Sequence, residues 1–499
     1  MSGADDELGA VLGDVVAGLR EASRAPALSA AAGRGGDVVW AGAVGAPAGA
    51  GTDGGPTPEH AFRIGSITKP MVAVAVMRLV EEGKVALHDP IGAHLPDAPA
   101  VDATLAELLS HTSGLPAEPA GAWWERAGGS TWEQIVASDL PRLVAPGTRY
   151  HYSNVGFAVL GRLVEVARGR SWDEVLRDEL WVPLGMTATG RVPVGPHVRG
   201  YAVHPHADLV HDEPVADYLA MGPAGELWST PSDLVRFGMW LACHDTLGAV
   251  GDAVLPVPAR RLMTAPRVVV DEPGVAWTGT YGLGVRVRKD LIDLPGEGPV
   301  PVRTVGHSGS VPGFTADLRV DAGSGDAVAV IGSSTGGFGD GTGLLAALRG
   351  VRPDVGHAGV GRGPVVDGSE EVTEGASEGL AEGRQPGGQP GAGGGVGAGL
   401  PELTGTWYWG PVPFTLRAEG DRLVLAGAAG GRATEFVPGT PGTWVGVTAG
   451  YWQGETFRPV EREGRVVALD VGTFCFTRSP YAPEVEIPGG HDGVGWHAL

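Results

Sequence analysis

The pattern of apolar residues predicts helices in four parts of the chain. Over residues 8–19, 104–109 and 156–167 they lie three and four positions apart, which predicts a helix in each segment. Residues 71–80 are apolar almost all round, and two glutamates and a glycine follow them. We therefore expect a central, buried helix here, although the run is too short to cross a bilayer.

Runs with strand character lie on both sides of this helical part. Residues 27–32 and 38–44, separated by a glycine-rich break, predict a pair of strands. Residues 280–287, 312–320 and 327–331 predict three more strands. Helices in the middle with strands at both ends favour an α+β domain, in which N- and C-terminal segments complete one antiparallel sheet.

The composition changes near residue 352. Residues 352–400 consist mainly of Gly, Pro, Glu and Ser, so they cannot bury enough apolar surface to offset the entropy of ordering, and we expect a flexible linker. Residues 401–499 alternate short β-rich runs with Gly and Pro turns, which predicts a small all-β domain. The first domain then covers residues 1–351. The expected strands of the second are 407–409, 414–416, 423–425 and 473–476.

The overall charge narrows the classes of partner. The formal net charge is −22, whereas nucleic acids and anionic membrane surfaces attract clustered Lys and Arg, so we expect neither as a partner. The first ten residues lack the basic region and apolar run of a secretory signal, which predicts a cytoplasmic protein. The only two cysteines, Cys243 and Cys475, show no metal or disulfide spacing and are expected to be buried thiols.

One of the few lysines, Lys69, lies close in sequence to a candidate nucleophile. The chain has only three lysines, and Lys69 follows Ser66 by three residues at the start of the apolar helix. Residues three apart share a helix face, and a buried lysine can lose the proton that an arginine keeps. Ser66 is therefore a candidate nucleophile that forms an acyl-enzyme, and its amide at the helix N-terminus is a candidate donor to an oxyanion.

Two further segments carry groups suited to the same reaction. Tyr152 and Asn154, within the run YHYSN, follow a turn and precede a helix, which places a phenol and an amide on a loop. A tyrosinate near an ammonium can act as a general base, and an amide can orient a lysine or a substrate carbonyl. In the later run GHSGS, Gly309 removes a side chain beside a cleft, and the amide of Ser310 is a second candidate oxyanion donor.

Together and in this order, the three motifs resemble the S-x-x-K, Y-x-N and K/H-x-G elements of the serine β-lactamase and penicillin-binding-protein superfamily. The runs LLSHTSGL and AGEL, and the run STPSDL after them, resemble further segments of that family. The resemblance covers roughly residues 26–334. It implies an antiparallel sheet flanked by helices, with an all-helical subdomain. The C-terminal domain resembles the lipocalin-like barrel of some relatives, and we hypothesise that it shapes the substrate entrance.

The resemblance also implies a role for each site residue. Ser66 would be acylated, Lys69 and Tyr152 would move its proton, and Asn154 would position a small ester or amide substrate. The third motif consists of His307, Ser308 and Gly309, and the amides of Ser66 and Ser310 would form the oxyanion hole. The reaction that the family implies needs no metal and no cofactor.

The third motif departs from the pattern of the classical enzymes. His307 replaces a lysine by a group that is largely neutral above about pH 6.5, so the grip on a substrate carboxylate should weaken. This variant resembles the esterases and D-aminopeptidases of the superfamily more than its β-lactamases. A β-lactamase or DD-carboxypeptidase is the alternative function, and a non-catalytic ligand-binding protein of the same fold is the alternative of a different class.

Other conspicuous residues are assigned structural roles. Glu226 is expected to be a solvated loop residue; if it faced the site, it would favour an amino group on the substrate. His111 is expected in a structural turn. A surface role is expected for His204, His206, Asp208, His211 and Asp212, whose spacing only mimics a metal site. Two further groups are the tryptophans 123, 124 and 132, which either line the acyl pocket or fill the helical subdomain, and 407, 409, 444 and 452, which are expected in the barrel core.

Overall fold

The computed structural model describes most of the chain. The described residues are 3–46, 55–121, 123–270, 279–294, 298–350, 400–427, 433–448, 451–481 and 495–498. Apart from Leu400, the predicted linker therefore lies outside the described residues, and the domain boundaries drawn from it stay a prediction.

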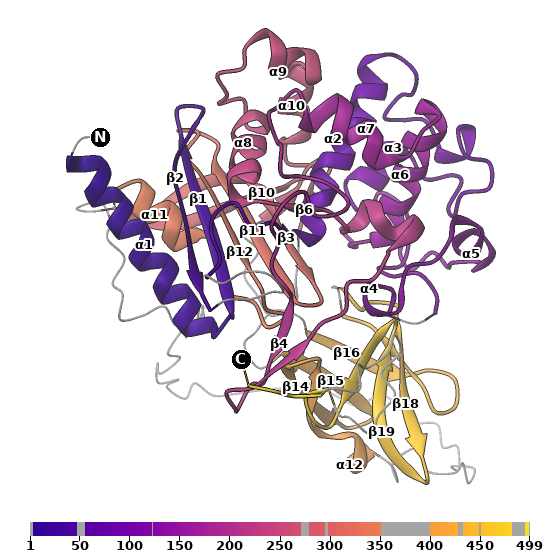
Figure 1. Ribbon diagram of the computed structural model, residues 1–499. Helices are drawn as coiled ribbons and strands as arrows, with labels where there is room; N and C mark the ends of the chain where they lie inside the picture. Colours follow the sequence, from indigo (N-terminus) through magenta and orange to yellow (C-terminus); the bar gives the residue numbers. More distant parts are fainter. Residues whose placement is uncertain are drawn as a thin grey trace, which may run out of the picture.

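An eight-stranded antiparallel sheet organises the larger part of the molecule, with strand order β2-β1-β12-β11-β10-β9-β8-β7 (Figure 1). The N-terminal hairpin pairs with the last strand of the sheet, Leu28 opposite Gly332, so both ends of this part complete the sheet as predicted. The strands are β1 (Ala27–Arg34), β2 (Asp37–Gly45), β7 (Val268–Val269), β8 (Gly279–Tyr281), β9 (Arg286–Leu294), β10 (Gly298–Val311), β11 (Phe314–Asp321) and β12 (Ala327–Gly332).

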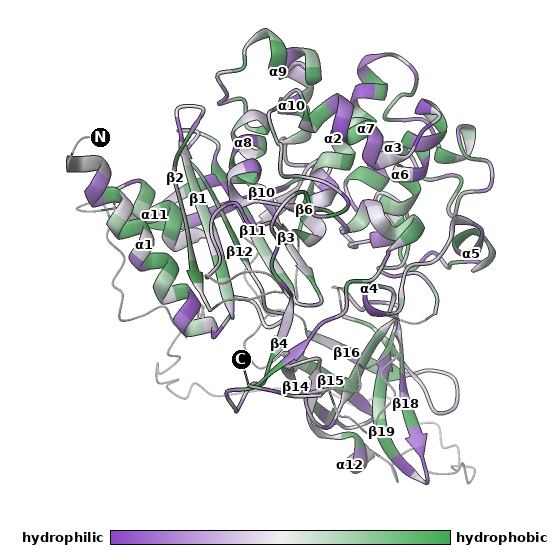
Figure 2. Ribbon diagram, viewed as in Figure 1, coloured by the Kyte–Doolittle hydropathy of each residue, from purple (hydrophilic) through white to green (hydrophobic). Residues whose placement is uncertain are grey.

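Helices cover both faces of this sheet. α1 (Gly3–Ser23) and α11 (Thr342–Leu348) pack on one face, and α8 (Pro231–Leu241) packs on the other (Figure 1). Strand β1 is buried on both sides, because alternate side chains enter different apolar clusters: Leu28 joins the cluster with α1, and Ala31 joins the main core. Figure 2 shows purple and green residues mixed along α1, as expected for a helix with one exposed face.

A helical subdomain lies to the right of the sheet in Figure 1, and its buried side chains belong to the same main apolar core as those of the sheet. Its central helix α2 is buried from Thr68 to Met77, as its all-round apolar sequence predicts. The helices and 3-10 or π turns of this part of the chain are η1 (Gly65–Ile67), α2 (Thr68–Glu81), η2 (Ile91–Ala93), α3 (Leu105–Leu109), α4 (Trp124–Ala127), α5 (Trp132–Ala137), α6 (Asn154–Arg168), α7 (Trp172–Leu176), η3 (Arg177–Trp181) and η4 (Leu219–Ala224). The remaining short elements are β3 (Phe62–Arg63), β4 (Tyr201–Val203), β5 (Val210–Asp212), β6 (Trp228–Ser229), α9 (Ala249–Val254) and α10 (Val257–Met263).

The C-terminal part is a closed eight-stranded barrel in which each strand pairs with its neighbours in sequence and β13 pairs with β20. This confirms the predicted small all-β domain, although the sequence indicated only four of its strands. The core is aromatic and contains all four predicted tryptophans. The elements are α12 (Leu400–Leu403), β13 (Gly405–Trp409), β14 (Val412–Glu419), β15 (Arg422–Gly427), β16 (Ala433–Pro438), β17 (Trp444–Gly446), β18 (Thr456–Arg462), β19 (Arg465–Val471) and β20 (Phe474–Thr477).

Two details differ from the sequence predictions. The single strand expected at 280–287 is a hairpin of β8 and β9, because the chain reverses through Gly282 and through Gly284, whose φ is +76°. Gly282 also lies so close to a neighbouring carbonyl that a Cβ would approach Met263 O to 2.1 Å. Cys475 is buried as expected, whereas Cys243 is only half-buried.

The barrel and the larger part share a buried polar contact. Arg126 donates to Glu213 at 2.9 Å and 2.8 Å, and both side chains are almost completely buried. The other carboxylate oxygen of Glu213 accepts from Thr335 and from Tyr481, which follows the last barrel strand. A charge pair without water contributes most when all its hydrogen bonds are made, so this contact ties the two parts together.

We expect Arg126→Ala to destabilise the protein by about 3–5 kcal/mol, because Glu213 would keep a buried charge without its cation. The matched control is Arg422→Ala, which breaks an exposed ion pair with Glu435 and should cost less than about 1 kcal/mol. Thermal and urea unfolding of the full chain measure both variants. Equal stability losses in the two variants would contradict the assigned importance of the buried pair.

Candidate active site

The first predicted motif brings Lys69 directly onto Ser66. Ser66 lies in η1, Lys69 lies in the first turn of α2, and the Lys69 Nζ–Ser66 Oγ distance is 3.0 Å. Nζ also donates to Asn154 Oδ1 at 2.6 Å and to the carbonyl of Ala224 at 2.7 Å. The three ammonium donors are thus all used, and the arrangement joins the first two predicted motifs.

Burial changes the chemistry of Lys69. The side chain is completely buried, and this loss of hydration lowers its pKa to about 7, although Glu118 and Glu125 oppose the shift. Arg286 adds to the lowering by repulsion. A substantial fraction of the amine is therefore neutral near neutral pH, so it can accept a proton from the neighbouring hydroxyl.

Tyr152 adjoins the same pair but is not a tyrosinate. Its hydroxyl is hydrogen-bonded to Ser66, and its ring centre lies 4.8 Å from Lys69 Nζ. Burial raises the pKa of Tyr152 well above its ordinary value, so the phenol keeps its proton. The sequence-based expectation of a tyrosinate base is therefore not supported by this environment. A neutral phenol can still donate or relay a proton.

Close backbone packing places the two predicted oxyanion donors together. The register of β9 with β10 ends at Gly306, and beyond it β10 lies against η1. A Cβ on Gly309 would approach Ile64 O to 1.9 Å, and a Cβ on Gly65, whose φ is +50°, would approach Ser310 N to 2.7 Å. Only glycine allows this approach at either position, and the amides of Ser66 and Ser310 meet at the same place.

His307 is held as a neutral imidazole. Its Nδ1 lies 2.6 Å from the carbonyl of Ser308, which can only accept, so Nδ1 carries the proton and Nε2 accepts from Tyr281 at 2.8 Å. Burial, followed by the charges of Arg286 and Lys69, lowers the pKa of His307 well below its ordinary range. His307 therefore supplies no cation, as predicted from the sequence.

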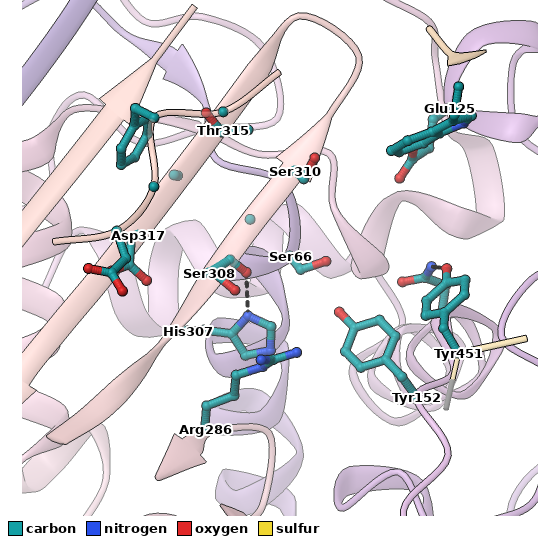
Figure 3. Close-up of a pocket in the computed structure, with 18 of the residues that line it drawn as sticks. Ser66, Glu125, Tyr152, Arg286, His307, Ser308, Ser310, Thr315, Asp317 and Tyr451 are labelled. Carbon is teal, nitrogen blue, oxygen red and sulfur yellow. Dashed lines mark hydrogen bonds between the residues drawn. The ribbon is translucent and has the colours of Figure 1, made fainter. Parts of the chain in front are cut away.

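A cavity of about 370 Å³ opens onto Ser66, and both the larger part and the barrel line it. Figure 3 shows His307 and Arg286 on one side of Ser66, and Tyr152 with Tyr451 on the other. The predicted site residues in its wall are Ser66, Tyr152, Asn154, His307, Ser308, Gly309 and Ser310. Residues that the sequence reasoning missed include Glu118, Glu125, Arg286, Trp409, Tyr451 and Phe474.

The missed residues differ in how they could have been found. Glu118 lies three residues after the family-like run LLSHTSGL, so the sequence could have indicated that it lies near the site. The sequence could not have indicated that it is buried. Arg286 lies opposite Gly306 in the sheet register, which the prediction of one strand at 280–287 concealed. Tyr451 comes from the barrel, and no local pattern links it to Ser66.

Of two residues assigned structural roles near the motifs, His111 keeps that role, whereas Glu226 is not where it was expected. Glu226 is not solvated but buried, because it pairs with Arg191 at 2.9 Å and accepts from the amide of Tyr218. It is absent from the cavity wall, so the conditional preference for an amino group does not apply to it. His111 is fully buried among aromatic rings and accepts from the amide of Ser153, as a structural residue would.

Two other groups are partly corrected. The surface role expected near residue 204 is wrong for His211, which is fully buried beside Tyr481. Within the described residues no cluster of His, Cys, Asp and Glu is suited to a metal ion. Trp124 and Trp132 fill the main core, whereas Trp123 joins the barrel cluster, and none of the three is in the cavity wall.

Comparisons with known proteins agree with this geometry. The family model "Beta-lactamase" matches residues 12–350, and a domain family of unknown function (DUF7586) matches residues 396–478. Penicillin-binding protein 4 of Amycolatopsis lactamdurans is 32% identical over 320 residues, which cover 60% of this chain and 80% of that protein. Esterase EstB of Burkholderia gladioli is 34% identical over 160 residues, 27% of this chain and 39% of its own length.

A solved structure shows the same fold in an amidase. The D-amino acid amidase from Ochrobactrum anthropi SV3, complexed with L-phenylalanine amide, is similar with a TM-score of 0.53 and 25% identity, over 72% of this chain and 98% of that one. The chain belongs to the β-lactamase family and is a serine hydrolase of the β-lactamase and penicillin-binding-protein type. Among the described helices, none combines the length and apolar character that crossing a membrane requires.

We expect the reactivity of Ser66 to rise with pH through a midpoint near 7, because neutral Lys69 is the form that accepts a proton. Lys69→Arg should lower the rate of labelling by a fluorophosphonate by about 10²–10⁴-fold, since arginine stays protonated. The control Lys84→Arg changes an exposed lysine and should label like the wild type. Stopped labelling reactions between pH 5.5 and 9.5 measure the profile. A flat profile would refute the role given to Lys69.

Proposed function

We propose that this protein hydrolyses a small ester or amide through an acyl-enzyme on Ser66. The observation that carries the proposal is the contact of 3.0 Å between Ser66 Oγ and the buried amine of Lys69, whose pKa is lowered to about 7. Burying an amine costs stability. A non-catalytic binding protein would gain nothing from that cost, whereas a hydrolase uses the lowered pKa of an amine beside its nucleophile.

The acylation step follows from these positions. Neutral Lys69 accepts the Ser66 proton while Oγ attacks the substrate carbonyl carbon, and the amides of Ser66 and Ser310 stabilise the resulting oxyanion. The bond to the leaving group then breaks, and the leaving group receives the proton from Lys69 by way of Tyr152. The products of this step are an ester on Ser66 and a free alcohol or amine.

Deacylation uses the same groups in reverse. Water gives a proton to Lys69 and attacks the ester carbonyl, the oxyanion is stabilised as before, and Ser66 regains its proton as the acid leaves. Asn154 accepts from Lys69 and lines the cavity, so it is suited to keep the amine in place and to contact the substrate. Every proton is moved by the chain's own side chains.

The comparisons support an ester or amide as the substrate class. Relatives with related sequences or folds are named as an esterase, a D-amino acid amidase and a penicillin-binding protein. Neutral His307 favours the first two over a β-lactamase, because it removes the cation of the third motif. The cytoplasmic location and the boundaries of the two domains at residues 351 and 401 remain predictions from the sequence.

We expect Ser66→Ala to abolish both turnover of a p-nitrophenyl ester and labelling by a fluorophosphonate, a loss of at least about 10³-fold. The control Ser138→Ala removes a hydroxyl at the surface end of α5 and should leave both signals unchanged. Intact-protein mass spectrometry of the labelled chain locates the adduct. Turnover that persists in Ser66→Ala would overturn the proposed function.

A DD-carboxypeptidase is the second candidate, and Arg286 is the observation that favours it. Arg286 lines the cavity beside His307, so it could supply the cation that the third motif lacks and bind a substrate carboxylate. Its position on β9, next to Gly306 of β10, places this charge at the end of the cavity away from Tyr451 (Figure 3).

We expect Arg286→Gln to raise KM about tenfold for a D-alanyl-D-alanine peptide but not for the same peptide amidated at its C-terminus. The comparison of two substrates is needed because Arg286 also lowers the pKa of Lys69, which affects both equally. Arg303→Gln, at a more exposed position on β10, is the control. An equal change for the two peptides would remove the second candidate.

A further inference from the structure

A continuous chain of hydrogen bonds leads from the barrel to the nucleophile. Tyr451, between β17 and β18, donates its hydroxyl proton to Glu118 Oε1, and Asn154 Nδ2 donates to the same oxygen at 2.9 Å. The other end of the Asn154 amide accepts from Lys69 at 2.6 Å, and Lys69 donates to Ser66 at 3.0 Å. Five side chains from two parts of the fold therefore form one network.

Tyr451 is held in this place by packing as well as by its hydroxyl. Its ring lies 5.4 Å from that of Phe474 and 6.3 Å from that of Trp452, both in the barrel cluster. On the opposite side it faces the Tyr152 ring at 6.1 Å (Figure 3). The Asn154 amide nitrogen also lies 3.4 Å from the Tyr451 hydroxyl. The barrel thus fixes where this phenol meets the larger part.

We propose that Tyr451 is a positioning residue, which the barrel contributes to orient Glu118 and Asn154 and thereby hold Lys69 on Ser66. The inference rests on the proposed function, because it assigns Tyr451 to the activation of the same serine. It gives the barrel a part in the chemistry itself, in addition to forming a wall of the cavity.

Because Glu118 is buried, the hydrogen bond from the Tyr451 phenol affects whether its carboxyl group is charged. The carboxylate is 7% exposed and receives hydrogen bonds from Tyr451, Trp124 and Asn154, which favour its charged form against the effect of burial. Without the phenol, the pKa of Glu118 rises further and it takes up a proton more readily. The negative charge that raises the pKa of Lys69 is then withdrawn, so the pKa of Lys69 falls.

Whether the pKa of Lys69 falls or rises when Tyr451 is lost depends on all the charges around Lys69 and Glu118. Near Lys69 and Glu118, the titratable and charged groups are Glu125, Arg286, Tyr152, His111, His307 and Glu455. His111 and His307 are neutral, and Tyr152 keeps its proton. Burial and the neighbouring Glu118 raise the pKa of Glu455 to about 7, so Glu455 carries little charge below neutral pH. The loss of charge on Glu118 therefore determines that the pKa of Lys69 falls.

The test compares Tyr451→Phe with wild type in the full chain, using a p-nitrophenyl acetate assay from pH 5 to 9.5. We expect the plateau of kcat/KM to fall about tenfold and the acidic midpoint to move down by roughly half a unit. The control Tyr408→Phe removes another barrel hydroxyl, one that contacts His206 at the surface, and should change neither value. A small ester is chosen because a residue that only walls the cavity would scarcely affect it.

A double-mutant cycle separates positioning from a loss of folding. Glu118→Gln should move the midpoint in the same direction, and adding Tyr451→Phe to it should change the profile little, because both variants interrupt the same link. Additive effects, a wild-type profile in Tyr451→Phe, or a lower plateau with an unchanged midpoint would each overturn the inference. Ser66→Ala in the same assay keeps the two hypotheses apart: if Ser66→Ala is inactive while Tyr451→Phe keeps the wild-type profile, the proposed function stands and the inference about Tyr451 fails.

Discussion

The site depends on keeping the Lys69 ammonium away from water. A buried ammonium is stable only if hydrogen-bond acceptors replace its hydration shell. Here a hydroxyl, a side-chain amide oxygen and a backbone carbonyl each accept one hydrogen bond from the Lys69 ammonium. The apolar helix α2 supplies the surrounding core, which is why it is buried on all sides rather than on one. The same removal from water that is costly for stability brings the pKa to about 7, where the amine can exchange protons.

A second constraint is the close approach of β10 to η1. Two glycines without side chains allow the backbone of Ser310 to meet that of Ser66, so the oxyanion donors are fixed by the sheet and not by mobile side chains. The sheet is in turn completed by the N-terminal hairpin through β1 and β12. Segments far apart in sequence therefore hold the two amides at a fixed separation, which is the form of preorganisation that acyl transfer needs.

Much of the larger part was readable from the sequence because its signals are local. The all-round apolar run of α2, the helical spacing in α6, the strand-like run of β1 and the three motifs each lie within a few residues. The predicted elements are present, and the side chains of the three motifs lie together at one site. The hairpin of β8 and β9 was missed because its two glycines occur inside a run that otherwise looks like one strand. Propensity alone does not show that a neighbouring carbonyl leaves no room for a side chain.

What could not be read depends on burial and on contacts between distant segments. The sequence suggested that Tyr152 would be ionised, but enclosure by other aromatic groups keeps the phenol protonated. It suggested that Glu226 would be in solvent, whereas an arginine from another loop accompanies it into the interior. Tyr451 carried no signal at all, since its meaning comes from the way a separate barrel is placed against Glu118.

The order in which a ribosome makes this chain gives the contact between the barrel and the larger part a further consequence. Ser66 and Lys69 are synthesised well before the cavity-lining barrel residues Trp409, Tyr451 and Phe474. A nascent or prematurely terminated chain therefore has the nucleophile but lacks one wall of its cavity and one end of its hydrogen-bonded network. The cavity around Ser66 is therefore complete only once the barrel has been synthesised and has folded against the larger part.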